Sequence, residues 1–236
     1  LWALNPDTPL EDYIVETWTL KKGFISDMVE KMTQTPDGYL WISSSEGLLR
    51  YDGLQFDLIN HDIPDKGTPV IKMPHDILAD DAGNLWLSVK EGVFRYKQGT
   101  FDFFPTGSID GFPASSLGID QSGVVYTGRT EGYYRFYNGA FVPVPIHRDI
   151  KEDITVNHTF RDNQGRLWLS AYKSGVIVRQ DGRFIRVALK TIPGSYRVYC
   201  STGQPGGKMW FGTDKGLVAV QGDKQFLYTT RDGLAD

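Results

Sequence analysis

Five segments of the chain repeat one pattern of glycines and aromatic residues, and this repeat limits the fold more than any other feature. In each segment a turn glycine is followed three residues later by an aromatic residue, and another glycine comes six or seven residues after that. The aromatic residues are Trp41, Trp86, Tyr126, Trp168 and Trp210, with separations of 45, 40, 42 and 42 residues. Chance does not hold these features in register five times, so the segments are copies of one structural unit.

Each repeat predicts four short strands separated by glycine turns. The first strand precedes the turn glycine, the second contains the aromatic residue, and the third lies between the next two glycines. The fourth contains a phenylalanine, and these residues are Phe56, Phe101, Phe141, Phe184 and Phe226. A period of 40–45 residues with four strands per unit is typical of a β-propeller blade. We therefore expect an all-β fold, a β-propeller of five four-stranded blades that is part of a larger propeller.

The phase of the repeats predicts the limits of the blades within one propeller domain or propeller segment that covers 1–236. The blades are expected at 25–60, 70–104, 113–144, 153–187 and 196–230, after an N-terminal outer strand and the start of the first blade at 1–24. Residues 17–24 resemble residues 228–234, and both look like a fourth strand that leads into another blade. The chain is therefore expected to stop inside a longer propeller, because a closed five-bladed ring leaves the N-terminal strand as an unpaired edge.

Charge and composition exclude several classes of protein. Lys and Arg number 25 against 29 Asp and Glu, which gives a net charge of −4, so no nucleic-acid partner is expected. One cysteine, Cys200, excludes an internal disulfide and a cysteine-rich zinc site. No apolar run approaches the ~20 residues that span a bilayer. We find no signal peptide, and we expect contact with a membrane only through a segment downstream of this sequence.

The first repeat carries a motif of a known family. It reads DGYLWI at 37–42, EGLLRYDG at 46–53, and then Phe56. This pattern resembles the two-component regulator propeller repeat, and the resemblance covers essentially the whole chain. The opening residues 3–6, Trp18 and residues 22–24 resemble the start of the mature periplasmic sensor region in that family. Two repeats depart from the pattern, since Tyr126 replaces Trp in the third and the fourth lacks the acidic residue before its third-strand glycine.

The resemblance implies a non-catalytic sensor module in the periplasm, as the extracytoplasmic part of an inner-membrane protein. Family members typically carry a membrane helix and a cytoplasmic output domain, commonly a histidine kinase or a diguanylate cyclase, and this chain contains no motif of either output. The expected partners are an oligosaccharide or another small ligand, the rest of the parent sensor chain, and a second copy of the chain. No cofactor, metal or catalytic residue is expected.

The candidate ligand site comes from the position eight residues before each turn glycine, where the inner strand begins. The residues at this position are Glu30, His75, Ser115, Asn157 and Tyr199. Equivalent residues of a propeller face the central opening, so this set predicts a ring for a cation or a polar ligand. The alternative is that the position faces a water-filled channel and is polar for that reason alone. The next residues are also polar, which weakens the contrast, and they are Lys31, Asp76, Ser116, His158 and Cys200.

Two residues in the turns between the second and third strands, Arg129 and Tyr172, complete the ligand candidates, because exposed aromatics beside polar donors suit a sugar or a protein surface. Other groups are interpreted as structural. The four histidines are expected on surfaces or loops, the segments 80–83 and 162–165 as turns rather than calcium loops, and the glutamates that precede the third-strand glycines as turn residues. The third-strand arginines Arg50, Arg95 and Arg135 are expected to form structural ion pairs.

Two other functions stay open at this point. A metal-dependent propeller enzyme, similar to a lyase or lactonase, predicts that two or more of Glu30, His75, Asn157 and His158 lie within metal-bonding distance of one another. A scaffold for protein contacts predicts a large exposed apolar patch on one face. Fold alone does not choose among the three functions.

Overall fold

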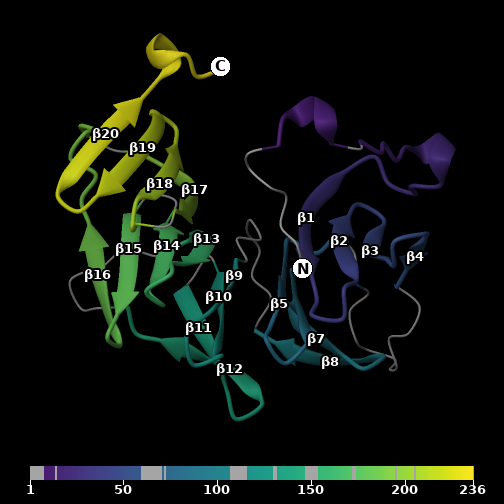
Figure 1. Cartoon of the computed structure of the whole chain (residues 1–236). Coiled ribbons are helices and arrows are strands. Elements are labelled where there is room, and N and C mark those ends of the chain that lie inside the picture. Colours follow the sequence, from purple (N-terminus) through teal and green to yellow (C-terminus); the bar gives the residue numbers. More distant parts are fainter. Residues whose placement is uncertain are drawn as a thin grey trace.

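The computed structural model contains five four-stranded antiparallel sheets arranged around an axis as a five-bladed β-propeller (Figure 1). It describes residues 8–13, 15–59, 71, 73–106, 116–129, 132–146, 154–171, 174–194, 196–204 and 206–235. In every sheet the strands lie side by side in chain order, so each blade is a meander. The all-β propeller predicted from the repeat is confirmed.

The blades are named A to E in chain order. Blade A consists of β1 (Val29–Gln34), β2 (Leu40–Ser44), β3 (Gly47–Tyr51) and β4 (Phe56–Leu58). Blade B consists of β5 (Asp76–Ala79), β6 (Leu85–Val89), β7 (Gly92–Lys97) and β8 (Thr100–Pro105). Blade C consists of β9 (Leu117–Ile119), β10 (Val125–Arg129), β11 (Gly132–Tyr137) and β12 (Ala140–Val144). Blade D consists of β13 (Val156–Arg161), β14 (Leu167–Ala171), β15 (Gly175–Gln180) and β16 (Arg183–Val187). Blade E consists of β17 (Val198–Gly203), β18 (Met209–Thr213), β19 (Gly216–Gln221) and β20 (Lys224–Tyr228).

The described helical segments are three 3₁₀ turns, η1 (Leu10–Asp12), η2 (Leu20–Lys22) and η3 (Thr230–Asp232). None of them has the length and hydropathy of a transmembrane helix. η2 precedes blade A and η3 follows blade E.

A side chain six residues before the core aromatic residue holds the turn between the first two strands of a blade. The indole N–H of Trp41 donates to Thr35, Trp86 donates to Asp80 and Trp168 donates to Asp162, at 2.9, 2.9 and 2.8 Å. In blade C the Tyr126 hydroxyl donates to Asp120 at 2.9 Å. The same carboxylates accept backbone N–H groups of their own turns, so 80–83 and 162–165 are turns, as predicted.

The described residues form four apolar cores, and each lies between two consecutive blades. The core aromatic residue of one blade packs against the third strand of the next blade. Trp41 contacts Tyr96 and Trp86 contacts Phe136, both at 5.0 Å between ring centroids. The predicted role of the repeated aromatic residue as an interblade core residue is therefore confirmed for the first four blades.

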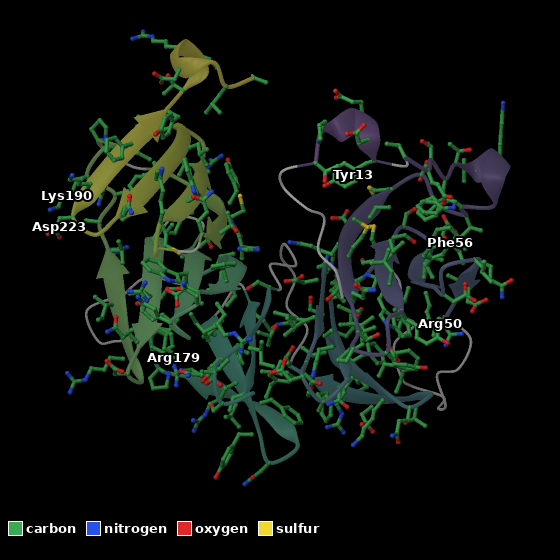
Figure 2. All side chains as sticks on the ribbon, in the orientation of Figure 1. Tyr13, Arg50, Phe56, Arg179, Lys190 and Asp223 are labelled. Atoms are coloured by element: carbon green, nitrogen blue, oxygen red, sulfur yellow. The ribbon has the colours of Figure 1, made fainter. Side chains whose placement is uncertain are left out.

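Blades C and D meet through a different pair. Tyr126 replaces Trp in blade C, and Arg179 replaces the aromatic residue on the third strand of blade D. Arg179, which is labelled in Figure 2, places its guanidinium 5.3 Å from the Tyr126 ring centroid and 3.3 Å from the Asp120 carboxylate. Tyr126 and Arg179 thus depart from the repeat together and are partners in one contact.

The predicted structural role of the third-strand arginines is confirmed in two blades, where Arg50 pairs with Asp57 at 2.9 Å and Arg95 pairs with Asp102. The guanidinium of Arg135 lies over the Tyr137 ring instead, at 5.2 Å.

Phe226 lies on the fourth strand of blade E, as predicted, but it does not occupy the position of the other four repeat phenylalanines. Gln225 pairs with Val220 and occupies the position of Phe101, whereas Phe226 pairs with Ala219 and is 48% exposed. The turns between the third and fourth strands of blades B and E both have two residues, but the phenylalanine is the second residue after the turn in blade B and the third in blade E. Side chains alternate between the two faces of a strand, so this shift by one residue moves the phenylalanine to the other face of blade E.

Candidate functional site

Four of the five predicted ring residues, Glu30, His75, Asn157 and Tyr199, lie at or next to the starts of the inner strands, at one end of the central axis. β1, β5, β9, β13 and β17 lie next to one another in chain order. Glu30, Asn157 and Tyr199 are the extra residues of β-bulges, because the strand register shifts between Val29 and Lys31, between Val156 and His158, and between Val198 and Cys200. A bulge redirects its side chain out of the regular alternation. In blades A, D and E, a β-bulge therefore distinguishes the ring position from its neighbours on the inner strand.

Three blades contribute charged groups at this end of the axis, and we call Glu30, His75, Glu91 and Arg129 the mouth cluster. Burial lowers the pKa of His75. The carboxylates of Glu30 and Glu91 act in the opposite direction, and Arg129 lowers the pKa further. Arg129 also donates from Nη2 to the backbone carbonyl of Lys90 at 2.7 Å. Glu91, interpreted from the sequence as a turn residue alone, thus lies near enough to His75 to influence its pKa, as do the predicted ligand residues Glu30 and Arg129.

The other predicted site residues do not join the mouth cluster. The Asn157 amide donates to the backbone carbonyl of Val198 at 3.2 Å and so connects blade D to blade E. Tyr199 is 46% exposed on β17. Ser115 and Tyr172 lie outside the described residues, as do His61 and His147.

The next position along the inner strands forms a second set, which we call the axial belt: Lys31, Asp76, Ser116, His158 and Cys200. Each of its central members bonds to the following blade. The Asp76 carboxylate accepts the Leu117 N–H at 2.8 Å, Ser116 bonds to Thr159 at 3.1 Å, and His158 Nδ1 accepts the Ser201 N–H at 3.3 Å. The polarity of these three members of the belt is thus explained by side-chain bonds between neighbouring blades.

Burial raises the pKa of one member of the belt, Asp76, and lowers that of another, His158. It raises the pKa of Asp76 from 3.8 to about 6, against the hydrogen bond from Leu117 and the charge of Lys31. It lowers the pKa of His158 from 6.5 to about 4, and the charge of Lys31 lowers it further. Both shifts favour the uncharged side chain.

The residues named for a metal centre do not form one. In the part of the chain that the structure describes, no three His, Cys, Asp or Glu side chains are grouped so that they could hold a metal ion. Asn157 and His158 are already bonded to blade E. The enzyme hypothesis therefore has no metal-ligand set among these residues.

A polar groove of about 460 Å³ lies between blades C and D at the other end of the strands. It is lined by the turns at 120–122, 164–166 and 179–182. Its two arginines are held in place, since Arg166 pairs with Asp162 at 2.7 Å while Arg179 pairs with Asp120. Sequence reasoning missed this groove. The signal for it was that Tyr126 replaces Trp in the third repeat while Arg179 replaces the third-strand aromatic residue in the fourth.

The chain matches neither a protein-family model nor a curated protein. Among solved structures, it is similar to the extracellular domain of the putative one component system BT4673 from B. thetaiotaomicron, with a TM-score of 0.50 and 15% identity over 89% of this chain and 34% of that chain. It is also similar to virginiamycin B lyase from Staphylococcus aureus, with a TM-score of 0.65 and 13% identity over 85% of this chain and 70% of the lyase. PorZ of Porphyromonas gingivalis, a surface component of the type-IX secretion system, has a TM-score of 0.67 and 15% identity over 88% of this chain and 34% of its own.

These similarities support a propeller fold that occurs both in the extracellular domain of a one component system and in a lyase. The chain spans about a third of the length of the BT4673 domain and of PorZ. Fold similarity at 13–15% identity does not carry function from any of the three proteins to this chain.

Proposed function

We propose that this chain is a non-catalytic extracytoplasmic input module of a bacterial signal-transduction protein, and that it binds a polar ligand at the mouth cluster. In this proposal the bound state, or a dimer, controls a histidine kinase or cyclase output in the cytoplasm. Two observations support the sensor class: the resemblance of the repeat to the two-component regulator propeller, and the fold similarity to the extracellular domain of BT4673.

The mouth cluster carries the ligand-binding part of the proposal. Its charged groups come from three blades, and its polarity is not explained by bonds between inner strands as that of the axial belt is. Glu30 is exposed and His75 is partly buried, so the cluster offers a carboxylate and an imidazole to a molecule at the axis. Carboxylate, imidazole and guanidinium groups together supply both acceptors and donors of hydrogen bonds.

The ligand class that we propose is an oligosaccharide. Its hydroxyl groups can donate to Glu30 and accept from Arg129, and the exposed ring of Tyr199 at the equivalent position of blade E offers an apolar face. A neutral ligand also fits a cluster that contains charges of both signs.

The test is a screen of neutral and acidic oligosaccharides by thermal shift, followed by calorimetry on the best ligand. We expect Glu30→Ala to weaken binding by about ten-fold, the effect of losing about 1.4 kcal/mol, with an unchanged melting temperature because Glu30 is exposed. Gln180→Ala, in the polar groove at the opposite end, is the matched control and should bind as the wild type does. Equal binding by Glu30→Ala and wild type would disprove the mouth cluster as the site.

A further inference from the structure

The two faces of blade E have different surroundings. One face packs against blade D in the apolar core that includes Phe211 and Val218. The other face is the one that, in blades A to D, packs against the following blade. No apolar core among the described residues joins blade E to blade A, and Figure 1 shows these two blades at opposite ends of the series.

Equivalent residues show that this face of blade E is uncovered. In the first four blades the core aromatic residue and its third-strand neighbour are at most 6% exposed. These pairs are Trp41 with Leu48, Trp86 with Val93, Tyr126 with Tyr133 and Trp168 with Val176. The fifth pair, Trp210 and Leu217, is partly exposed. Phe226 and Tyr228 lie on the same face through their register with Ala219 and Leu217.

Trp210 also lacks the hydrogen bond that its equivalents make. Gln204 stands six residues before it, where the other blades have Thr or Asp. The Trp210 indole N–H is buried and has no hydrogen-bond partner among the described residues. Its ring lies 5.7 Å from the Tyr228 ring and 4.4 Å from Lys208 Nζ, both groups of blade E. Trp41 and Trp86 contact a third-strand aromatic residue of the following blade, and Trp210 has no such ring contact among the described residues.

The segment after blade E repeats the segment before blade A. Thr19 and Thr229 are extended residues that start η2 and η3, and Gly23 and Gly233 end them in the left-handed region, with φ of 86° and 94°. The N–H of the next residue then donates to the threonine carbonyl, from Phe24 at 3.0 Å and from Leu234 at 3.3 Å. The similarity of the two sequences therefore reflects one structural motif.

The N-terminal copy of this motif shows what it packs against. Phe24 contacts Phe56 of blade A at 5.1 Å, and Trp18 contacts Tyr51 and Phe56 at 5.1 and 5.7 Å. The motif thus places apolar side chains on the blade that follows it. Leu234, the counterpart of Phe24, is 37% exposed.

We propose that this face of blade E, formed by Trp210, Leu217, Phe226, Tyr228 and Leu234, is an interblade interface that takes a sixth blade of the same repeat. The occupant has an aromatic residue at the third-strand position of Tyr96, which covers Trp210, and an apolar residue at the position of Phe56, which contacts Leu234. Blade A of a second copy is disfavoured, because Trp18 and Phe24 already contact its Tyr51 and Phe56.

The test extends the chain after Asp236 with a copy of residues 27–59, which follow η2 as a sixth blade would follow η3. Hydrogen exchange of β18 and β19 is compared with that of the unextended chain. We expect exchange to slow by about ten-fold or more where the new blade covers Trp210. The control extension carries Tyr51→Ser and Phe56→Ser in the appended copy and should give little protection.

A second extension uses a copy of residues 73–106 of blade B. It shows whether a failure of the first extension to fold is specific to the sequence of blade A. If an appended blade protects its own amides but leaves exchange in β18 and β19 unchanged, the proposal is wrong. It is also wrong if neither appended blade becomes protected, because the face then does not support a blade. A concentration-dependent dimer of the unextended chain that protects β18 and β19 would assign the face to a second copy and overturn the proposal.

Discussion

The indole N–H of Trp168 donates a 2.8 Å hydrogen bond to the Asp162 carboxylate, six residues earlier in blade D. Asp162 lies in the turn between the first two strands, and Trp168 lies in the core between blades D and E. The same relationship joins Asp80 to Trp86. A turn carboxylate therefore anchors the aromatic residue that packs the next blade, so turn chemistry and interblade packing are one feature of the repeat.

Removal of this anchor should destabilise the propeller. Asp162→Ala leaves the buried Trp168 N–H and two backbone N–H groups of the turn without their acceptor. An unsatisfied buried donor costs about 1–3 kcal/mol, so we expect a loss of about 2–4 kcal/mol in urea unfolding at pH 7. Asp223→Ala, in an exposed turn, is the control and should lie within about 0.5 kcal/mol of wild type. A loss below 1 kcal/mol for Asp162→Ala would contradict the anchoring role.

The anchor should also give a defined pH dependence. Burial alone would raise the pKa of Asp162, but hydrogen bonds from Trp168 and Arg166 outweigh it and hold the pKa below its ordinary value of 3.8. A carboxylate with a lowered pKa in the folded state stabilises the fold above its ordinary pKa, and this contribution is lost as the pH falls. The stability difference between wild type and Asp162→Ala should therefore shrink below pH 4.

The axial belt should give opposite pH dependences from two residues. The pKa of Asp76 is raised from 3.8 to about 6 in the folded state, so its contribution is largest below pH 4 and falls as the pH rises to 6. The pKa of His158 is lowered from 6.5 to about 4, so its contribution is present above 6.5 and is lost as the pH falls to 4. Each difference in pKa between the folded and unfolded states corresponds to about 3 kcal/mol of stability. Between pH 4 and 6 the two changes in stability with pH nearly cancel.

Single variants should reveal these two contributions. Relative to wild type, Asp76→Asn is expected to gain stability as the pH rises from 4 to 6, because an amide oxygen still accepts the Leu117 N–H without the cost of a buried charge. His158→Gln is expected to lose stability relative to wild type over the same range. The measurement is urea unfolding of the three proteins at several pH values. Parallel pH profiles for all three would show that neither group titrates differently in the folded state.

The sequence predicts those parts of the fold that depend on residue spacing within one repeat, and it predicts contacts between distant positions poorly. The glycine and aromatic spacing predicted the blades because each repeat must bury the same face against its neighbour. The exposure of Phe226 was missed although the spacing carries it: the phenylalanine lies ten residues after the third-strand glycine in the fifth repeat and nine residues after it in the other four. The approach of Glu91 to His75 was also missed, because it depends on the arrangement of blades around the axis. Pairing of Arg179 with Asp120 joins positions 59 residues apart, and only the two repeat departures pointed to it.

The contact between Tyr126 and Arg179 should contribute measurably to the interface of blades C and D. Arg179→Ala removes the cation from the Tyr126 ring and the partner from Asp120, so we expect a loss of about 1–2 kcal/mol. Arg179→Lys keeps the charge but not the planar group, and an intermediate loss is expected. The exposed Arg183 lies nearby on β16, and Arg183→Ala should be near neutral. If Arg179→Ala and Arg183→Ala have the same stability in urea unfolding, the contact does not hold the blades together.

Replacement of Trp168 and of Trp210 should distinguish a covered interblade face from an uncovered one. Trp168→Ala opens a cavity in the core between blades D and E, and a buried tryptophan of this kind costs about 3–5 kcal/mol when truncated. Trp210→Ala removes the equivalent ring from the uncovered face of blade E, where the side chain is partly exposed and its N–H has no acceptor among the described residues. We expect a loss of about 1–2 kcal/mol there, because less apolar area leaves the interior. Urea unfolding of both variants at one pH measures the difference, and equal losses would mean that Trp210 is as covered in solution as Trp168.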